Sequence, residues 1–127
     1  MSVDPEGKKI LVIQTHGVET PNRTYSPLFY AMAAAAMEME VLVWFTMDGT
    51  NQLKRGAAEQ VELKPGSGVT LKTMLENAME SEVELRVCQQ SLELFDMTTD
   101  DLIDGVDILG ATSIIDLALN ADHVMYF

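Results

Sequence analysis

Cys88 is the only cysteine among the 127 residues of the chain, and it follows a run, 83–87, that is expected to form a β-strand. A helix is expected to begin directly after it. In parallel α/β proteins, ligands and chemistry collect at the carboxyl ends of the strands. Free backbone N–H groups at the start of the next helix would favour the thiolate, which is the reactive form of cysteine. A lone cysteine cannot form an internal disulfide, so Cys88 is reactive, structural or part of a metal site.

The residues around Cys88 are polar, which favours a reactive site. Arg86 lies two positions earlier and projects from the same face of the expected strand, where its guanidinium could stabilise a thiolate. The three residues that follow are Gln89, Gln90 and Ser91. A small buried hydrophobic role, which is common for free cysteines, remains the alternative.

His16 is the second candidate for chemistry, because Thr15 and His16 follow the expected strand 9–13 and therefore lie at the same edge of the sheet. A general base for Cys88 would need a ring nitrogen within hydrogen-bond reach. The alternative is a solvent-exposed loop histidine. His123 opens the last expected strand at the opposite edge and is assigned no role. Two histidines and one cysteine so far apart match no zinc spacing, so no metal site is predicted.

Several cofactor chemistries lack the residues that they require. The chain contains neither G-x-x-x-x-G-K-[ST] nor G-x-G-x-x-G, so the loops that cradle nucleotide phosphates are missing. The first strand ends without the acidic cluster of a phosphoacceptor domain. Glu19 in the following loop would repel a flavin phosphate. We therefore predict no cofactor.

The charge balance limits the partners of the chain. Twenty acidic and eight basic side chains give a formal net charge of −12, which disfavours nucleic acid and anionic membrane surfaces. The longest apolar run, 28–37, has ten residues, about half of the roughly 20 that a membrane helix needs. The N-terminus lacks the pattern of a signal peptide. Together with one unpaired cysteine, these features predict a cytoplasmic protein.

Alternating strand and helix patterns predict one α/β domain over 8–127, preceded by a flexible tail at 1–7. We expect a three-layer α/β/α arrangement with a mainly parallel, five-stranded sheet, whose strand order the sequence does not reveal. The expected strands are 9–13, 41–45, 83–87, 106–109 and 123–127, and the expected helices are 26–39, 69–81, 89–95 and 110–120.

Two details of this pattern can be tested directly. Ser26 before Pro27 predicts the N-cap of the first helix, and Thr112 or Ser113 predicts the cap of the last one. In the third strand, the apolar residues at 83, 85 and 87 face one side, and the residues at 84, 86 and 88 face the other. That second face is expected to be solvated, covered by a partner, or near a site.

The chain resembles the DsrE/DsrF-like family of small sulfur-relay proteins over roughly 8–127. The resemblance is carried by Thr15-His16-Gly17 after the first strand, the alanine-rich first helix, the aromatic second strand and Val87-Cys88 at a strand end. It continues through the closing segments 105–111 and 121–125. The resemblance implies a flavodoxin-like fold and a homo-oligomer, often a trimer or hexamer. Active family members carry sulfur as a persulfide on one cysteine, which corresponds here to Cys88.

The resulting hypothesis is a cytoplasmic sulfur carrier or sulfurtransferase that holds sulfane sulfur on Cys88 and passes it to the thiol of a small carrier protein. Backbone N–H groups of Gln89 and Gln90 would stabilise the thiolate, and Arg86 would be a charge partner. Thr15, His16 and Ser91 would form pocket walls. Some relatives lack the cysteine and act only as structural partners. The alternatives are therefore a non-catalytic assembly or small-ligand-binding subunit with an inert Cys88, and a small-molecule or redox sensor.

Overall fold

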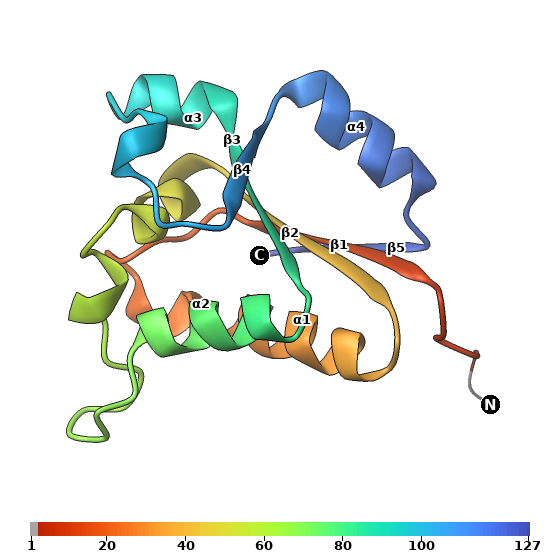
Figure 1. The fold of residues 1–127 in the computed structure, drawn as a ribbon, viewed down its shortest axis with the longest axis horizontal. Coiled ribbons are helices and arrows are strands. Elements are labelled where there is room, and N and C mark those ends of the chain that lie inside the picture. The colour runs from red at the N-terminus through yellow and green to blue at the C-terminus, as the bar shows by residue number, and fades with distance from the viewer. Residues whose placement is uncertain (1–2) are drawn as a thin grey trace.

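The structure is a computed structural model that describes residues 3–127, and it contains one five-stranded sheet. Every neighbouring pair of strands is parallel, and the strand order is β4-β3-β2-β1-β5. Figure 1 shows the twisted sheet at the centre of the molecule. The strands are β1 (Lys9–Gln14), β2 (Glu40–Phe45), β3 (Glu84–Cys88), β4 (Val106–Leu109) and β5 (His123–Tyr126).

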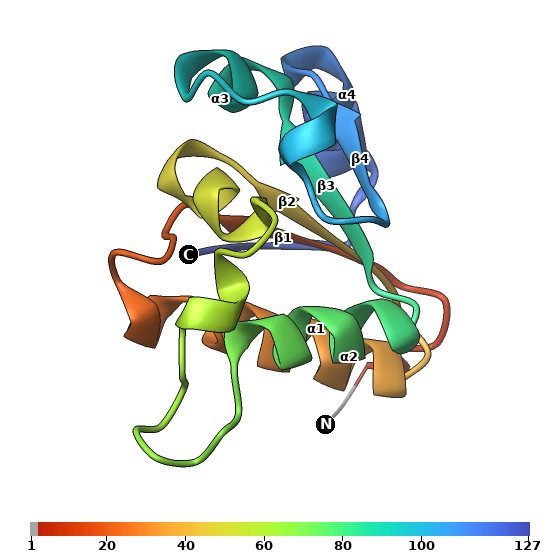
Figure 2. The same cartoon turned by 60° about the vertical axis from the view of Figure 1, so that its left-hand side comes forward.

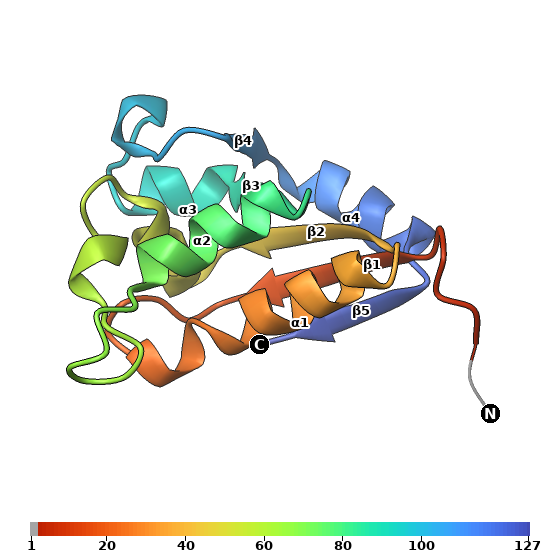
Figure 3. The same ribbon diagram turned by 60° about the horizontal axis from the view of Figure 1, so that its bottom comes forward.

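Helices cover both faces of this sheet, which confirms the three-layer α/β prediction. Helices α1 (Ser26–Ala36) and α2 (Leu71–Glu80) lie side by side under one face (Figure 2). Helix α4 (Ala111–Asn120) crosses the opposite face on its way from β4 to β5, and Figure 3 shows α1 and α4 in separate layers. The short helix α3 (Gln89–Leu94) follows β3 directly at the carboxyl edge.

The main core lies between the sheet and the α1–α2 layer. The inward residues alternate along β2 and β3 as the strand period requires, and all of those on this side are buried. They are Val41, Val43, Phe45, Leu85 and Val87. Leu28 and Ala31 of α1 pack against them, because alanines let this helix approach the sheet closely. The predicted alternation in β3 is thereby confirmed, and Cys88 projects to the α4 side of the sheet.

The predicted strands and helices are present, but two predicted helix starts were wrong. Tyr25 already has helical angles (φ −90°, ψ −31°), so Ser26 is the first helical residue and caps nothing. In α4 the N-cap is Gly110, and the helix begins before Thr112 or Ser113 could cap it. The first helix is also shorter than the predicted 26–39, because Glu38 takes a left-handed conformation (φ 64°) that turns the chain into β2.

The N-terminal residues precede β1. Residues 1 and 2 of the predicted tail 1–7 lie outside the described part of the chain. Residues 3–7 belong to no helix or strand, although the Gly7 N–H donates to the Glu38 carbonyl at 2.9 Å. Within 3–127, no helix has the length and apolar character needed to cross a bilayer.

Candidate functional site

Cys88 is the last residue of β3 and the N-cap of α3, so the strand and the helix together position its sulfur. It pairs across the sheet with Leu109 of β4. Only 6% of the residue is exposed, and its thiol is free. The site is therefore a nearly buried thiol at the carboxyl edge, where the parallel strands direct functional groups.

Two buried hydroxyl groups accompany the sulfur. Thr46 directly follows β2, the neighbour of β3, and Ser91 lies in the first turn of α3. Their side-chain oxygens are 3.4 Å apart, and the Met47 N–H donates to the Ser91 Oγ at 2.8 Å. These contacts join α3 to the segment after β2, so the backbone and the hydroxyls beside Cys88 are held in one network.

Opposing effects act on the pKa of Cys88. Burial raises the pKa of the thiol, but the Ser91 and Thr46 hydroxyls and the backbone N–H groups of Ser91 and Gln90 together hold the pKa below its ordinary value. The Cys88 side chain makes no capping hydrogen bond of normal geometry to α3. Polar hydrogens around the sulfur therefore favour the thiolate.

The contributing N–H groups differ by one residue from the expected pair. Gln89 and Gln90 were expected, whereas Gln90 and Ser91 contribute. The reason is geometric, because an N-cap side chain faces the N–H groups two and three residues ahead. The Gln89 side chain extends toward Gly110. A Cβ atom built on Gly110 would lie 3.3 Å from Gln89 Oε1.

Arg86 shares the sheet face of Cys88 but is paired elsewhere. Its Nη2 is 3.5 Å from Glu84 Oε2, and its Nη1 is 3.9 Å from Asp107 Oδ2. Nη1 also donates to the Leu85 carbonyl at 2.9 Å. Arg86 is not among the groups that lower the pKa of Cys88. Its charge is therefore shared with carboxylates on β3 and β4.

Thr15 and His16 lie at the same edge of the sheet but on the other side of β2. The Thr15 hydroxyl donates to the Phe127 carbonyl at 2.7 Å, next to β5. His16 lines a separate cavity of 270 Å³ together with Arg23, Tyr30 and others. Because β2 lies between β1 and β3, these two strands are about 10 Å apart. The structure thus brings Cys88, Gln90 and Ser91 together and places Thr15 and His16 in a different group.

Thr46 was not among the predicted site residues. Its signal in the sequence is its position directly after 41–45, which puts a hydroxyl at the carboxyl edge. Recognising its proximity to Cys88 requires the pairing of β2 with β3, which only the structure supplies.

The family assignment follows from the sequence match and agrees with this geometry. The sequence model of the DsrE/DsrF-like family matches residues 8–127, which is nearly the entire chain. The chain belongs to the DsrE/DsrF-like family. The earlier resemblance is therefore confirmed.

Individual relatives of this DsrE/DsrF-like protein cover almost its full length. The sulfur carrier protein DsrE2 of Allochromatium vinosum is 26% identical, and the match covers 95% of this chain and 99% of the relative. The crystal structure of the ychN protein from E. coli superposes with a TM-score of 0.79 at 24% identity, covering 94% of this chain and 99% of the other. MTH1491 of Methanobacterium thermoautotrophicum gives 0.68 at 15% identity, covering 94% and 99%. The two solved structures show a shared fold.

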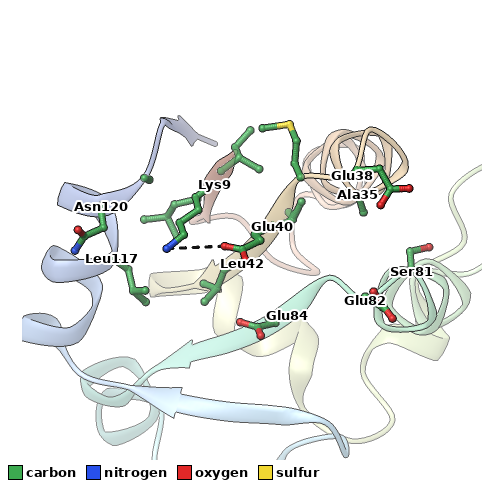
Figure 4. A pocket seen from close by; sticks show the side chains of 15 residues that line it. Lys9, Ala35, Glu38, Glu40, Leu42, Ser81, Glu82, Glu84, Leu117 and Asn120 are labelled. Atoms are coloured by element: carbon green, nitrogen blue, oxygen red, sulfur yellow. Dashed lines mark ion pairs between the residues drawn. The ribbon is translucent and has the colours of Figure 1, made fainter. Parts of the chain in front are cut away.

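One cleft of the DsrE/DsrF-like domain is remote from Cys88. It has a volume of 480 Å³ and lies at the amino edge of the sheet, among the first residues of β1, β2 and β3 (Figure 4). Lys9 Nζ approaches Glu40 Oε2 at 3.9 Å, and Glu84 and Leu117 line the same space. Among residues 3–127, no group of three His, Cys, Asp or Glu side chains could hold a metal ion. The thiol group at the opposite edge is therefore the better candidate for chemistry.

Proposed function

We propose that this protein is a sulfur carrier that holds a sulfane sulfur on Cys88 and passes it to a partner thiol. Membership of the DsrE/DsrF-like family and the sulfur carrier relative from Allochromatium vinosum support a role in sulfur relay. The observation that carries the proposal is the environment of Cys88, where two hydroxyls and two N–H groups lower the pKa of a strand-end thiol.

The proposed loading step is an exchange between sulfur atoms. The Cys88 thiolate attacks the outer sulfur of a donor persulfide, R–S–SH. A bond forms between Sγ and that sulfur, and the donor S–S bond breaks. The donor leaves as R–S⁻ and takes up a proton, while Cys88 becomes Cys–S–SH. In the unloading step a partner thiolate attacks the outer sulfur and Cys88 leaves as a thiolate, so no net oxidant is needed.

Burial of the sulfur sets a requirement for access. Cys88 is only 6% exposed, so a donor reaches it when α3 or the segment after β2 moves aside. Helix α3 has six residues, which makes it too short to be stable by itself. We propose that local opening of α3 admits the donor, and that Ser91 returns to its contact with Met47 when α3 closes.

A small carrier protein is the partner that we propose for unloading. A persistent free thiol suits the reducing cytoplasm, where we place the protein.

Self-association into a trimer or hexamer is proposed from a second surface. The α4 side of the sheet carries exposed apolar side chains that a monomer would leave in water. They are Ile115 and Leu119 on α4 and Val124 and Tyr126 on β5. We expect the paired substitution Ile115→Glu/Leu119→Glu to lower the mass measured by analytical ultracentrifugation. An unchanged mass, or a monomeric wild-type protein, would rule out this interface.

The burial of Cys88 also favours a second candidate, a non-catalytic assembly or ligand-binding subunit with an inert thiol. Alkylation by a small uncharged reagent separates the two functions. The carrier proposal expects native Cys88 to be labelled completely, at a rate below that of the unfolded chain. If labelling requires denaturation, the non-catalytic role is correct.

A further inference from the structure

We propose that the surface around Cys88 docks a basic and apolar segment of the partner protein. This inference rests on the proposed function, because it concerns the partner that exchanges sulfur with the same thiol. Two features of the surface carry it, namely exposed apolar side chains on the segments that hold the sulfur, and unpaired carboxylates beside them.

The apolar part consists of Met47, Leu94 and Phe95, which we call the apolar patch. Met47 is 57% exposed, Leu94 79% and Phe95 43%. Leu94 and Phe95 lie three and four residues after Ser91, so they extend the helix flank that carries this hydroxyl. The 2.8 Å contact of Met47 N with Ser91 Oγ brings the two segments together. The patch therefore lies on the same two segments that enclose Cys88.

The acidic part adjoins each end of this patch in the chain. Asp48 follows Met47, Glu93 precedes Leu94 and Asp96 follows Phe95, and we call these three carboxylates the acidic rim. All three are exposed. Among residues 3–127, no ion pair involves any of them. Their charges are thus available to a partner.

The chain that follows Cys88 is negatively charged, like the acidic rim. After Cys88 the sequence contains eight carboxylates and neither lysine nor arginine. The eight are Glu93, Asp96, Asp100, Asp101, Asp104, Asp107, Asp116 and Asp122. Arg55, which reaches this region from the chain before Cys88, is paired with Asp104 at 2.8 Å. The chain after Cys88 is thus acidic throughout, which favours a cationic partner over an anionic one.

This combination selects among possible occupants. Small anionic sulfur donors, such as thiosulfate or polysulfide ions, would be repelled by the rim and have no apolar surface to cover the patch. A second copy of this chain, whose proposed self-association surface lies on α4 and β5, has only eight basic side chains against 20 acidic ones and so matches the rim poorly. A segment that places lysine or arginine beside apolar side chains matches both features.

The test uses the full-length protein and two fluorescent peptides of equal length. Both carry leucine and phenylalanine, and both have serine where a partner would have cysteine. One carries lysines where the other carries glutamates. Fluorescence anisotropy at low ionic strength is expected to show at least roughly tenfold tighter binding of the lysine peptide, which weakens as salt is added.

Matched variants distinguish the rim from the overall charge of the protein. Asp48→Asn/Glu93→Gln/Asp96→Asn removes the rim, and Glu6→Gln/Glu80→Gln/Glu82→Gln removes the same charge elsewhere. The rim variant is expected to lose several-fold more affinity for the lysine peptide than the control. Leu94→Ser is expected to weaken binding of both peptides. Equal losses in the two triple variants, or no effect of Leu94→Ser, would overturn the inference.

This binding assay does not depend on sulfur chemistry, because neither peptide has a thiol. Selective binding by a protein whose Cys88 never acquires sulfur would disprove the carrier function and leave the docking surface intact. Loading of Cys88 without selective peptide binding would disprove the docking surface alone.

Discussion

The hydroxyl oxygen of Ser91 lies 2.8 Å from the backbone nitrogen of Met47 and so connects α3 to the end of β2. Through this contact, the segments that follow β2 and β3 together surround the Cys88 thiol. Ser91 also contributes to the low pKa of Cys88. The same side chain therefore affects both the reactivity of the sulfur and the closure of the helix over it.

Replacing Ser91 by alanine tests this double role. The Ser91→Ala change is expected to raise the pKa of Cys88, since it removes a hydrogen bond to the thiolate. The midpoint of the alkylation rate against pH should move upward accordingly. Ser113→Ala, an exposed change on α4, is the control and should leave the midpoint unchanged. A midpoint that does not move would show that Ser91 does not favour the thiolate.

The same variant has a pH-dependent effect on stability. Because the folded state lowers the pKa of Cys88, the thiolate contributes stability above the unfolded pKa, and this contribution is lost as the pH falls through the folded value. The difference in unfolding free energy between the wild type and Ser91→Ala should therefore grow as the pH rises through this range. Urea unfolding at several pH values measures it, and a difference independent of pH would contradict the explanation.

For Arg86, in contrast to Ser91, we expect that substitution leaves the pKa of Cys88 unchanged. Its guanidinium is paired with Glu84 and Asp107 and is not among the main groups that lower the pKa of Cys88. Arg86→Gln is therefore expected to leave the pH midpoint of Cys88 alkylation at its wild-type position. A clear upward movement of the midpoint would restore Arg86 as the charge partner expected from the sequence.

Asn51 ties the loop after β1 to the segment after β2. Its Nδ2 donates to Glu19 Oε2 at 2.6 Å, and its Oδ1 accepts from the Val18 N–H at 2.9 Å. Burial raises the pKa of Glu19, but hydrogen bonds from Asn51 and the Gly17 N–H hold it below the usual value.

Asn51→Asp keeps the acceptor for Val18 and places a second carboxylate beside Glu19. We expect it to lose about 0.5–1 kcal/mol of unfolding free energy at neutral pH, because the pair is exposed to solvent. The loss should shrink below about pH 4, where carboxyl groups take up protons. Asn51→Ala removes both contacts, so part of its loss should persist in acid. Chemical denaturation of both variants across this pH range provides the measurement, and parallel pH curves would contradict the Glu19 contact.

Two helix ends offer a stability prediction. Glu38 (φ 64°) and Glu82 (φ 68°) take left-handed conformations after α1 and α2, where glycine is usual. Glu82→Gly is expected to raise the unfolding free energy by about 0.5–1 kcal/mol, because it removes the strain of a side chain at positive φ. Glu76→Gly, within α2, should lower it by about 1 kcal/mol. Destabilisation by both changes would show that the Glu82 side chain makes a stabilising contact.

The periodic parts of the fold were predictable from the sequence, and the helix caps were not. Nearly continuous apolar runs at 9–13 and 41–45 correspond to inner strands, and the alternation in 83–87 correctly placed Cys88 opposite the main core. Ser26 failed as a cap because the preceding residue, Tyr25, takes the N-cap position and Ser26 is already helical. Such shifts of one residue depend on local backbone angles that composition does not determine.

Prediction of the site was limited by strand order. Ser91 could be found because it is close to Cys88 in sequence, but Thr46 becomes its neighbour only because β2 pairs with β3. His16 shares the carboxyl edge with Cys88, yet β2 separates the strands that lead to them. The sequence placed His16 and Cys88 at the same edge of the sheet, as the structure shows, while the strand order decides which residues meet there.

The most direct test of the carrier function is the intact mass of the native protein after incubation with an uncharged organic persulfide. We predict that the wild type gains the mass of one sulfur atom, that Cys88→Ser gains none, and that a reductant removes the added sulfur. Ser113→Cys in the Cys88→Ser background, an exposed thiol on α4, controls for unspecific loading and should gain less sulfur than the wild type. A wild-type protein without the added sulfur, or a gain that persists in Cys88→Ser, would contradict the proposal.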